Sequence, residues 1–127
     1  MRVLLFNDNH TRVTTTGAWV RKANSSAIGG QYLRSRTSGP SMSLSVKAAQ
    51  IAAIGHRGPT HGQAAIHLNG SPLAPISLVA ASTEVRRLLY LSPLPSNPAM
   101  TALRLVNQSP GEQRLVDIDA FLALVSD

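Results

Sequence analysis

The chain has 127 residues, a formal net charge of +6 and no cysteine. This length suits one compact domain, which we expect to span residues 1–127. The lack of cysteine excludes disulfides, thiolate metal sites and a cysteine nucleophile. No stretch approaches the roughly 18 apolar residues that a membrane-spanning helix needs. The apolar run at residues 1–6 is also too short for a secretory signal.

Arginine supplies ten of the twelve basic residues, and these are scattered along the chain. A nucleic-acid interface would gather them into a stripe with aromatic residues interleaved, so the pattern argues against nucleic acid as a partner. Arginine binds carboxylate and phosphate groups through its planar fork. An anionic polymer therefore stays open as a ligand.

Strand signals recur about every ten residues, with turn residues between them. This spacing favours an antiparallel sandwich or barrel. The expected strands, in chain order, are Val3–Phe6, Arg12–Val20, Gln31–Arg36, Ser41–Val46, Ala49–Ile54, Gln63–Leu68, Leu73–Val79, Val85–Leu91, Ala102–Asn107 and Arg114–Leu124.

Alternation and turns support the same fold class. The apolar residues of the 42–46 segment share one face and its serines share the other, as a half-buried strand requires. Asn69-Gly70 predicts a type I′ hairpin turn, because both residues tolerate positive φ. The proline-rich segment 92–98 predicts a stiff loop. The fold class we predict is all-β, an antiparallel sandwich.

Several soft motifs, taken in order, resemble the galactose-binding-domain-like β-sandwich, a jelly-roll accessory module of carbohydrate-binding type. They cover roughly residues 7–124. The motifs are Thr16-Gly17-Ala18-Trp19, Gly29-Gly30-Gln31-Tyr32, Gly39-Pro40-Ser41-Met42, the loop from Gly55 to Gly62, and Val116-Asp117-Ile118-Asp119-Ala120-Phe121. The resemblance implies a non-catalytic module that binds carbohydrate through loops at one end of the sandwich.

Five residues are the candidate ligand contacts: Trp19, Tyr32, His56, Arg57 and His61. The only tryptophan, Trp19, is either a sugar-stacking platform or a packing anchor. His56, Arg57 and His61 fall on a predicted loop between two strands, where they are either solvated or donate hydrogen bonds to a ligand. A two-histidine metal site would need remote ligands, since the loop holds no carboxylate.

Asp117 and Asp119 lie two residues apart on a predicted strand, which would place them on one face. They are either paired structural carboxylates or, with Asp8 or Asn7 as remote oxygen ligands, a structural calcium site. The resemblance adds weight to the calcium alternative, because related sandwiches often hold calcium where the chain ends meet, and structural carboxylates remain the first interpretation. Two positions on one strand are poorly placed to flank a glycosidic bond, which argues against glycosidase chemistry.

Three functions stay open, and none of them is enzymatic. The first is a carbohydrate-binding module, which would work outside the cell as part of a longer chain. The second is a structural subunit of a virion or similar assembly, such as a phage decoration or tail component. The third is a basic binder of anionic polymer, which rests on the charge alone.

Overall fold

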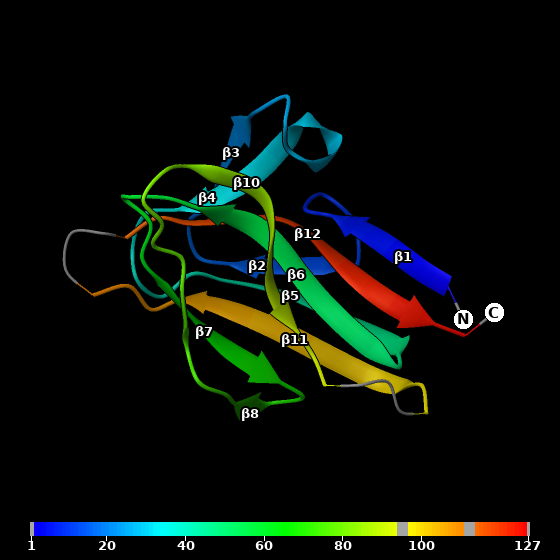
Figure 1. The fold of residues 1–127 in the computed structure, drawn as a ribbon. Helices are drawn as coiled ribbons and strands as arrows, with labels where there is room; N and C mark the ends of the chain where they lie inside the picture. The colour runs from blue at the N-terminus through cyan, green and yellow to red at the C-terminus, as the bar shows by residue number, and fades with distance from the viewer. Residues whose placement is uncertain (1, 94–96, 111–113, 127) are drawn as a thin grey trace.

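Short strands and tight turns build two antiparallel sheets that face each other in the computed structural model (Figure 1). The structure describes residues 2–93, 97–110 and 114–126. All ladders between the described strands are antiparallel. No helix in these three ranges is long and apolar enough to cross a membrane.

The first sheet, sheet A, is built around the C-terminal strand. Its strands in spatial order are β10 (Glu84–Leu91), β6 (Gln50–Arg57), β12 (Val116–Val125), β4 (Gln31–Ser35) and β3 (Val20–Ala23). The N-terminal strand β1 (Arg2–Asn7) also pairs with β12, in a register that joins Arg2 to Val125. The two ends of the described chain therefore lie side by side (Figure 1).

The second sheet, sheet B, packs against sheet A. Its strands in spatial order are β2 (Val13–Thr16), β5 (Ser41–Ala48), β11 (Ala99–Asn107), β7 (Gln63–Leu68) and β8 (Ser71–Pro72), with β9 (Ile76–Ser77) also on β7. A short 3₁₀ turn, η1 (Ile28–Gly30), precedes β4. The all-β antiparallel sandwich predicted from the sequence is confirmed.

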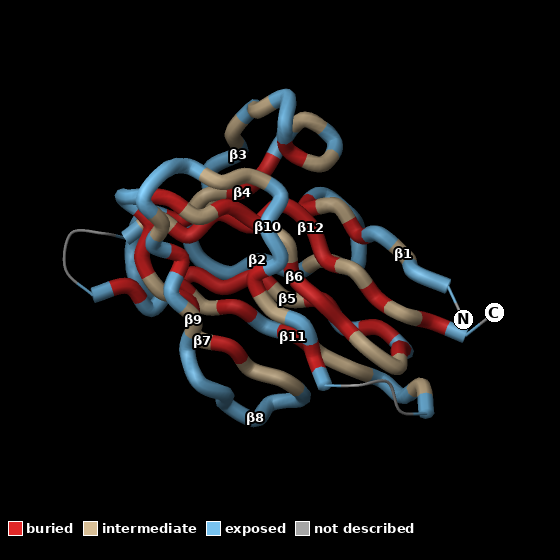
Figure 2. The backbone as a smooth tube through the Cα atoms, in the orientation of Figure 1, coloured by how far each residue is buried: buried red, intermediate tan, exposed pale blue. Residues whose placement is uncertain are grey.

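The core lies between the two sheets and is almost entirely aliphatic. Met42, Leu44 and Val46 point inward from β5, as their alternation predicts. Ile118 and Phe121 meet them from β12 and are fully buried. Each such side chain contributes about 1.5–3 kcal/mol on burial. Figure 2 shows this buried layer running along the central strands.

The Asn69-Gly70 hairpin turn is confirmed. Leu68 pairs with Ser71, so the loop between β7 and β8 has two residues. Asn69 and Gly70 have φ of 52° and 81°, which is the left-handed region that a type I′ turn requires at both positions.

One predicted strand, Arg12–Val20, is split between the two sheets. It forms β2 in sheet B and only the start of β3 in sheet A. The chain turns at Gly17, whose φ is 78° and where a Cβ atom would lie 2.9 Å from the Cα of Pro40. Glycine both allows the turn and lets the two backbones approach.

A second predicted strand, Leu73–Val79, shrinks to the two-residue strand β9, and the equally short β8 ends just before it. Pro72 and Pro75 lack the N–H that a continuous ladder needs, which accounts for the interruption. The other predicted strands agree with observed strands to within a few residues. Residues 94–96 of the predicted proline-rich loop lie outside the described residues.

Candidate functional site

Trp19 lies in the turn between β2 and β3. Its indole Nε1 donates hydrogen bonds to the carbonyl oxygens of Thr16 and Ser41, both at 3.1 Å. The ring packs against the core, and the residue as a whole is half-buried. Because its nitrogen is already satisfied, the exposed part of Trp19 is a fixed apolar surface. The structure thus shows Trp19 as a packing anchor, with part of its ring left exposed.

Three polar side chains form a row on the outer face of sheet A, the face that looks away from sheet B. Asp117 on β12 is directly opposite both His56 on β6 and Arg34 on β4. Its neighbours Val116 and Ile118 point into the core, so alternation places Asp117 on the outer side. Arg34 donates to both carboxylate oxygens, from Nε at 2.8 Å and from Nη2 at 3.0 Å.

The loop between β6 and β7 adds a fourth member to this row. His61 Nε2 lies 2.6 Å from Asp117 Oδ2. We call Arg34, His56, His61 and Asp117 the ionic row. Three of the four are almost fully buried, with exposures of 2% for His56, 3% for His61 and 1% for Asp117.

The expectation that His56 and His61 are solvated loop residues is therefore wrong. β6 continues to Arg57, so His56 is a strand residue. His61 is in a loop, but its bond to Asp117 holds it against the sheet. The sequence contains one sign of this polar row, which is that Tyr32 and Arg34 are two residues apart. That spacing puts both side chains on one face of β4.

The pKa shifts in the ionic row fix the protonation states of Asp117 and His56 in the folded state. Burial raises the pKa of Asp117, but hydrogen bonds from His61 and Arg34 outweigh it and hold that pKa below the ordinary 3.8. Burial lowers the pKa of His56 below 6.5. The His56 ring stacks edge-on against Tyr32, with centroids 4.3 Å apart. Neutral pH therefore leaves Asp117 ionised and His56 neutral.

Tyr32, on β4, packs against the ionic row. It is 8% exposed, and the Arg34 guanidinium carbon lies 5.7 Å from its ring centroid. Its pKa is raised by burial and by the charge of Asp117. Tyr32, His56 and His61 are thus brought together, but they face one another rather than solvent.

The His61–Asp117 pair lacks the third member of a catalytic triad. His61 Nδ1 is buried and has no hydrogen-bond partner within the described ranges. Gly58 lies next to this nitrogen, since a Cβ atom built on it would be 2.8 Å from His61 Nδ1, and glycine has no hydroxyl to offer. In the described chain the pair is an internal contact.

Arg57, the last of the predicted contacts, is half-buried at the end of β6. Its Nη2 is 3.4 Å from the carbonyl oxygen of Leu88, and it forms no ion pair with a described residue. The structure does not show it joined to Trp19 in one ligand site.

The regular strand alternation that the spacing of Asp117 and Asp119 predicts is interrupted between them. The register between β12 and β6 shifts between Ile118 and Ala120, so Asp119 is the extra residue of a β-bulge. Its Oδ2 accepts a hydrogen bond from the N–H of Ile28 at 2.8 Å. Both oxygens of Asp117 already accept hydrogen bonds, from Arg34 and His61.

Asp119 instead meets the end of β1. The N–H of Asp8 donates to the carbonyl oxygen of Asp119 at 3.2 Å, and Arg21 binds Asp8 Oδ1 at 2.8 Å. Three oxygens here are buried without a partner among the described residues: Asn7 Oδ1, Asp8 Oδ2 and Asp119 Oδ1. We call Asn7, Asp8 and Asp119 the acidic corner.

The acidic corner holds a carboxyl group with a shifted pKa. Burial and the nearby Asp8 raise the pKa of Asp119 to about 6, although the N–H of Ile28 and the charge of Arg86 act in the opposite direction. Carboxylate and amide oxygens are the donors that calcium prefers, and the unpartnered atoms fit such an ion. The corner contains two carboxylates, and no cluster of three His, Cys, Asp or Glu suited to a metal occurs in residues 2–93, 97–110 and 114–126.

No known family model matches the chain, and no curated protein matches it in sequence. Solved structures do match its fold. The family 35 carbohydrate-binding module from Clostridium thermocellum superposes with a TM-score of 0.64 at 18% identity, covering 94% of this chain and 98% of that one. The chain has the galactose-binding-like β-sandwich fold.

Two further solved structures have a similar fold, and both come from proteins that act on carbohydrates according to their names. The CBM36-1 domain of a multidomain xylanase from the hindgut metagenome of Trinervitermes trinervoides matches at 9% identity and TM-score 0.62, over 99% of both chains. A family two carbohydrate esterase from Cellvibrio japonicus matches at 14% identity and TM-score 0.70. This match covers 98% of our chain but only 34% of the esterase chain.

Proposed function

We propose that this sandwich is a non-catalytic carbohydrate-binding module that acts outside the cell. The observation that carries the proposal is Trp19, a rigid, half-buried indole whose nitrogen is held by two main-chain carbonyls. Such a surface stacks on the apolar face of a sugar ring. The fold adds support, since it matches two carbohydrate-binding modules over nearly their full length.

The lack of catalysis is part of the proposal. Among the described residues, no hydroxyl or thiol forms a hydrogen bond to His61 Nδ1, and both oxygens of Asp117 accept hydrogen bonds from Arg34 or His61. The similar structures include an esterase, so esterase activity is the reaction to assay first. The virion-subunit hypothesis gains no support from these matches.

A glycan array followed by calorimetry on the best ligand tests the binding proposal. Trp19→Ala should weaken binding by at least about ten-fold, roughly the loss of 1.4 kcal/mol. Trp19→Phe keeps an apolar ring and should lose less. Tyr90→Ala is the matched control, because Tyr90 is also a half-buried aromatic residue packed on the core but lies on β10.

Two outcomes would overturn the binding proposal. One is a wild-type protein that binds no glycan on the array. The other is equal binding by the Trp19→Ala variant, with circular dichroism showing that it is folded. A sodium chloride titration separates neutral from anionic ligands, because binding of an anionic polymer should weaken steeply as salt is added.

We also propose that the acidic corner holds a structural calcium ion, with Asn7, Asp8 and Asp119 as side-chain ligands. The three unpartnered buried oxygens support it. Calcium should raise the melting temperature and EGTA should reverse the rise. Asp119→Asn should abolish the calcium effect, whereas Asp117→Asn should keep it, because the oxygens of Asp117 are bonded to Arg34 and His61. An unchanged melting temperature in millimolar calcium would contradict the proposal.

A further inference from the structure

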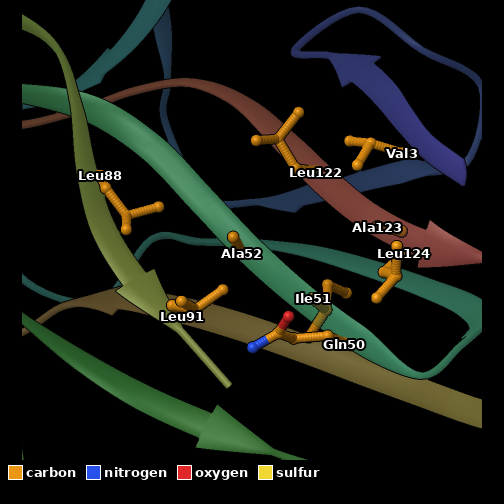
Figure 3. Close-up of a pocket in the computed structure, with 9 residues that line it drawn as sticks. All are labelled: Val3, Gln50, Ile51, Ala52, Leu88, Leu91, Leu122, Ala123 and Leu124. Atoms are coloured by element: carbon orange, nitrogen blue, oxygen red, sulfur yellow. The ribbon is translucent and has the colours of Figure 1, made fainter. Parts of the chain in front are cut away.

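The outer faces of the two sheets differ in chemistry. On sheet A, the end of the face that Figure 3 shows is aliphatic, with Val3, Leu88 and Leu91 exposed at the surface. On sheet B, the outer face is built mainly from hydroxyl, small and basic side chains, which alternate with the inward-facing core residues of β5, β11 and β7. A polar ligand therefore finds hydrogen-bonding groups across the face of sheet B.

Arg104 stands at the centre of the outer face of sheet B. It lies on β11, which has two strands on each side of it in the sheet. The ladder registers place Ser43 opposite it on β5 and His67 opposite it on β7. Leu103 and Leu105 point into the core, so alternation turns Arg104 outward, and the residue is exposed.

Most side chains around Arg104 are small. Ala102 precedes it by two residues on the same face, and Ser45 is opposite Ala102 on β5. Ala65 lies diagonally across from Arg104 on β7, two residues before His67. These short side chains make a low floor, so the guanidinium group is open to a molecule that lies along the sheet. We call this surface the basic face, and it consists of Ser43, Ser45, Lys47, Ala65, His67 and Arg104.

The basic face lacks the negative charge that balances arginine elsewhere in the molecule. On the side of sheet A, ion pairs join arginines to Asp8, Asp117 and Glu84. The six strands of sheet B contain no aspartate or glutamate, and no described residue forms an ion pair with Arg104 or Lys47. The planar fork of Arg104 therefore keeps its donors for a partner outside the chain, and a carboxylate or a similar oxyanion matches it.

Lys47 gives the basic face a second cation. It points outward from β5 and lies four residues beyond Ser43, which is about 13 Å along the strand. Two cations at this separation favour a ligand whose negative charges recur along a chain over a single small anion. The hydroxyl of Ser45 lies between them on the same face, where it offers a hydrogen bond to a sugar hydroxyl.

The composition of the basic face argues against nucleic acid. Proteins that bind single-stranded nucleic acid stack its bases on aromatic rings, and the described strands of sheet B hold no phenylalanine, tyrosine or tryptophan. Two cations are also few for a backbone that carries a phosphate on every nucleotide. A polysaccharide, in which sugar rings and hydroxyls separate the acidic groups, fits the face better.

We propose that the basic face binds an acidic polysaccharide, with Arg104 as the contact for a carboxylate or sulfate group and Lys47 as a second contact. The inference rests on the proposed function in that the ligand is a carbohydrate, and it adds a class of sugar polymer and a second surface. That surface is separate from the indole of Trp19, which is bonded to the carbonyl oxygens of Thr16 and Ser41 at the β2 edge of sheet B.

Biolayer interferometry on immobilised polygalacturonate, dextran sulfate and uncharged dextran tests the proposal. Salt at about 0.15 M screens long-range attraction between the basic chain and the polymers. The wild type should bind polygalacturonate, dextran sulfate or both, and should not bind dextran. Arg104→Ala should weaken binding by about ten-fold or more. Arg104→Lys keeps the charge but not the planar fork, so it should lose part of the affinity.

Arg36→Ala is the matched control. Arg36 is exposed just beyond β4 of sheet A and has no ion pair with a described residue, and its loss lowers the net charge by the same amount. This variant should bind like the wild type. Equal losses for Arg36→Ala and Arg104→Ala would mean that binding follows net charge alone, which overturns the proposal.

Two further outcomes would contradict an acidic polysaccharide as the ligand. One is an oligothymidylate that binds more tightly than either acidic polymer, which would assign the basic face to nucleic acid. The other is a wild type that binds neutral glycans on the array but neither acidic polymer. That result would leave the carbohydrate proposal standing and remove this one, whereas a protein that binds no glycan of any kind removes both.

Discussion

The two ends of the outer face of sheet A reverse the usual rule that polar side chains are exposed and apolar side chains are buried. At one end His56, His61 and Asp117 are buried, and at the other the aliphatic side chains of Val3, Leu5, Leu88 and Leu91 are exposed. The ionic row is covered because each charge has a partner and the 58–62 loop lies against it. On this face, therefore, a side chain is buried where a loop covers the strands, whatever its polarity. The charged side chains under the loop must then be paired with one another.

Removing the central carboxylate should have the largest effect on stability. Asp117→Ala leaves the Arg34 guanidinium and His61 without their acceptor in a buried setting. We expect a loss of about 3–5 kcal/mol in the free energy of unfolding. Urea unfolding measures it. A loss below about 1 kcal/mol would mean that the row is as dispensable as a surface ion pair.

Sequence alone predicted the fold well where local signals were strong. The alternation of Met42, Leu44 and Val46 and the Asn69-Gly70 turn were sufficient for two antiparallel sheets. The ionic row could not be predicted, because Arg34, His56 and Asp117 meet only through the pairing of β12 with β4 and β6. Such long-range pairings leave no periodic trace in a single sequence.

The acidic corner was found only in part. Asp8, Asn7 and Asp119 were expected to lie near the meeting chain ends, and the pairing of β1 with β12 brings them there. Asp117 lies on the last strand, as predicted, but a bulge at Asp119 breaks the two-residue alternation between the two aspartates. A bulge of this kind depends on the partner strand, so strand periodicity does not reveal it.

The acidic corner should give a stability that falls as pH rises. Its folded pKa of about 6 exceeds the ordinary 3.8, so the folded state binds the proton of Asp119 more tightly than the unfolded chain does. In the absence of calcium, stability should therefore decrease between about pH 4 and pH 6, by at most about 1.4 kcal/mol per pH unit. Asp119→Asn should remove this slope in urea unfolding measured at several pH values.

His56 should contribute the opposite slope. Its folded pKa lies below 6.5 because of burial, so the unfolded chain takes up the proton first as the pH falls. Stability should decrease as the pH drops below about 6.5, again by no more than about 1.4 kcal/mol per pH unit. His56→Gln in the Asp119→Asn background isolates this effect. If the slope of the double variant equals that of Asp119→Asn alone, His56 is not the titrating group.

The exposed aliphatic side chains of sheet A should give the smallest effect on stability. Leu91→Ser removes a side chain that is already half exposed, so we expect a loss below about 0.5 kcal/mol in the free energy of unfolding. Urea unfolding measures it. A loss above about 1 kcal/mol would mean that this end of sheet A depends on side-chain packing as the end with the ionic row does.

The pairing of β1 with β12 along their whole length has a practical consequence. Arg2 and Val125 are neighbours across one ladder, so a short peptide can join the two ends without crossing the sandwich. New ends can then be opened at the Asn69-Gly70 turn, whose two residues are exposed. The domain is therefore suited to circular permutation, and to insertion into a surface loop of another protein.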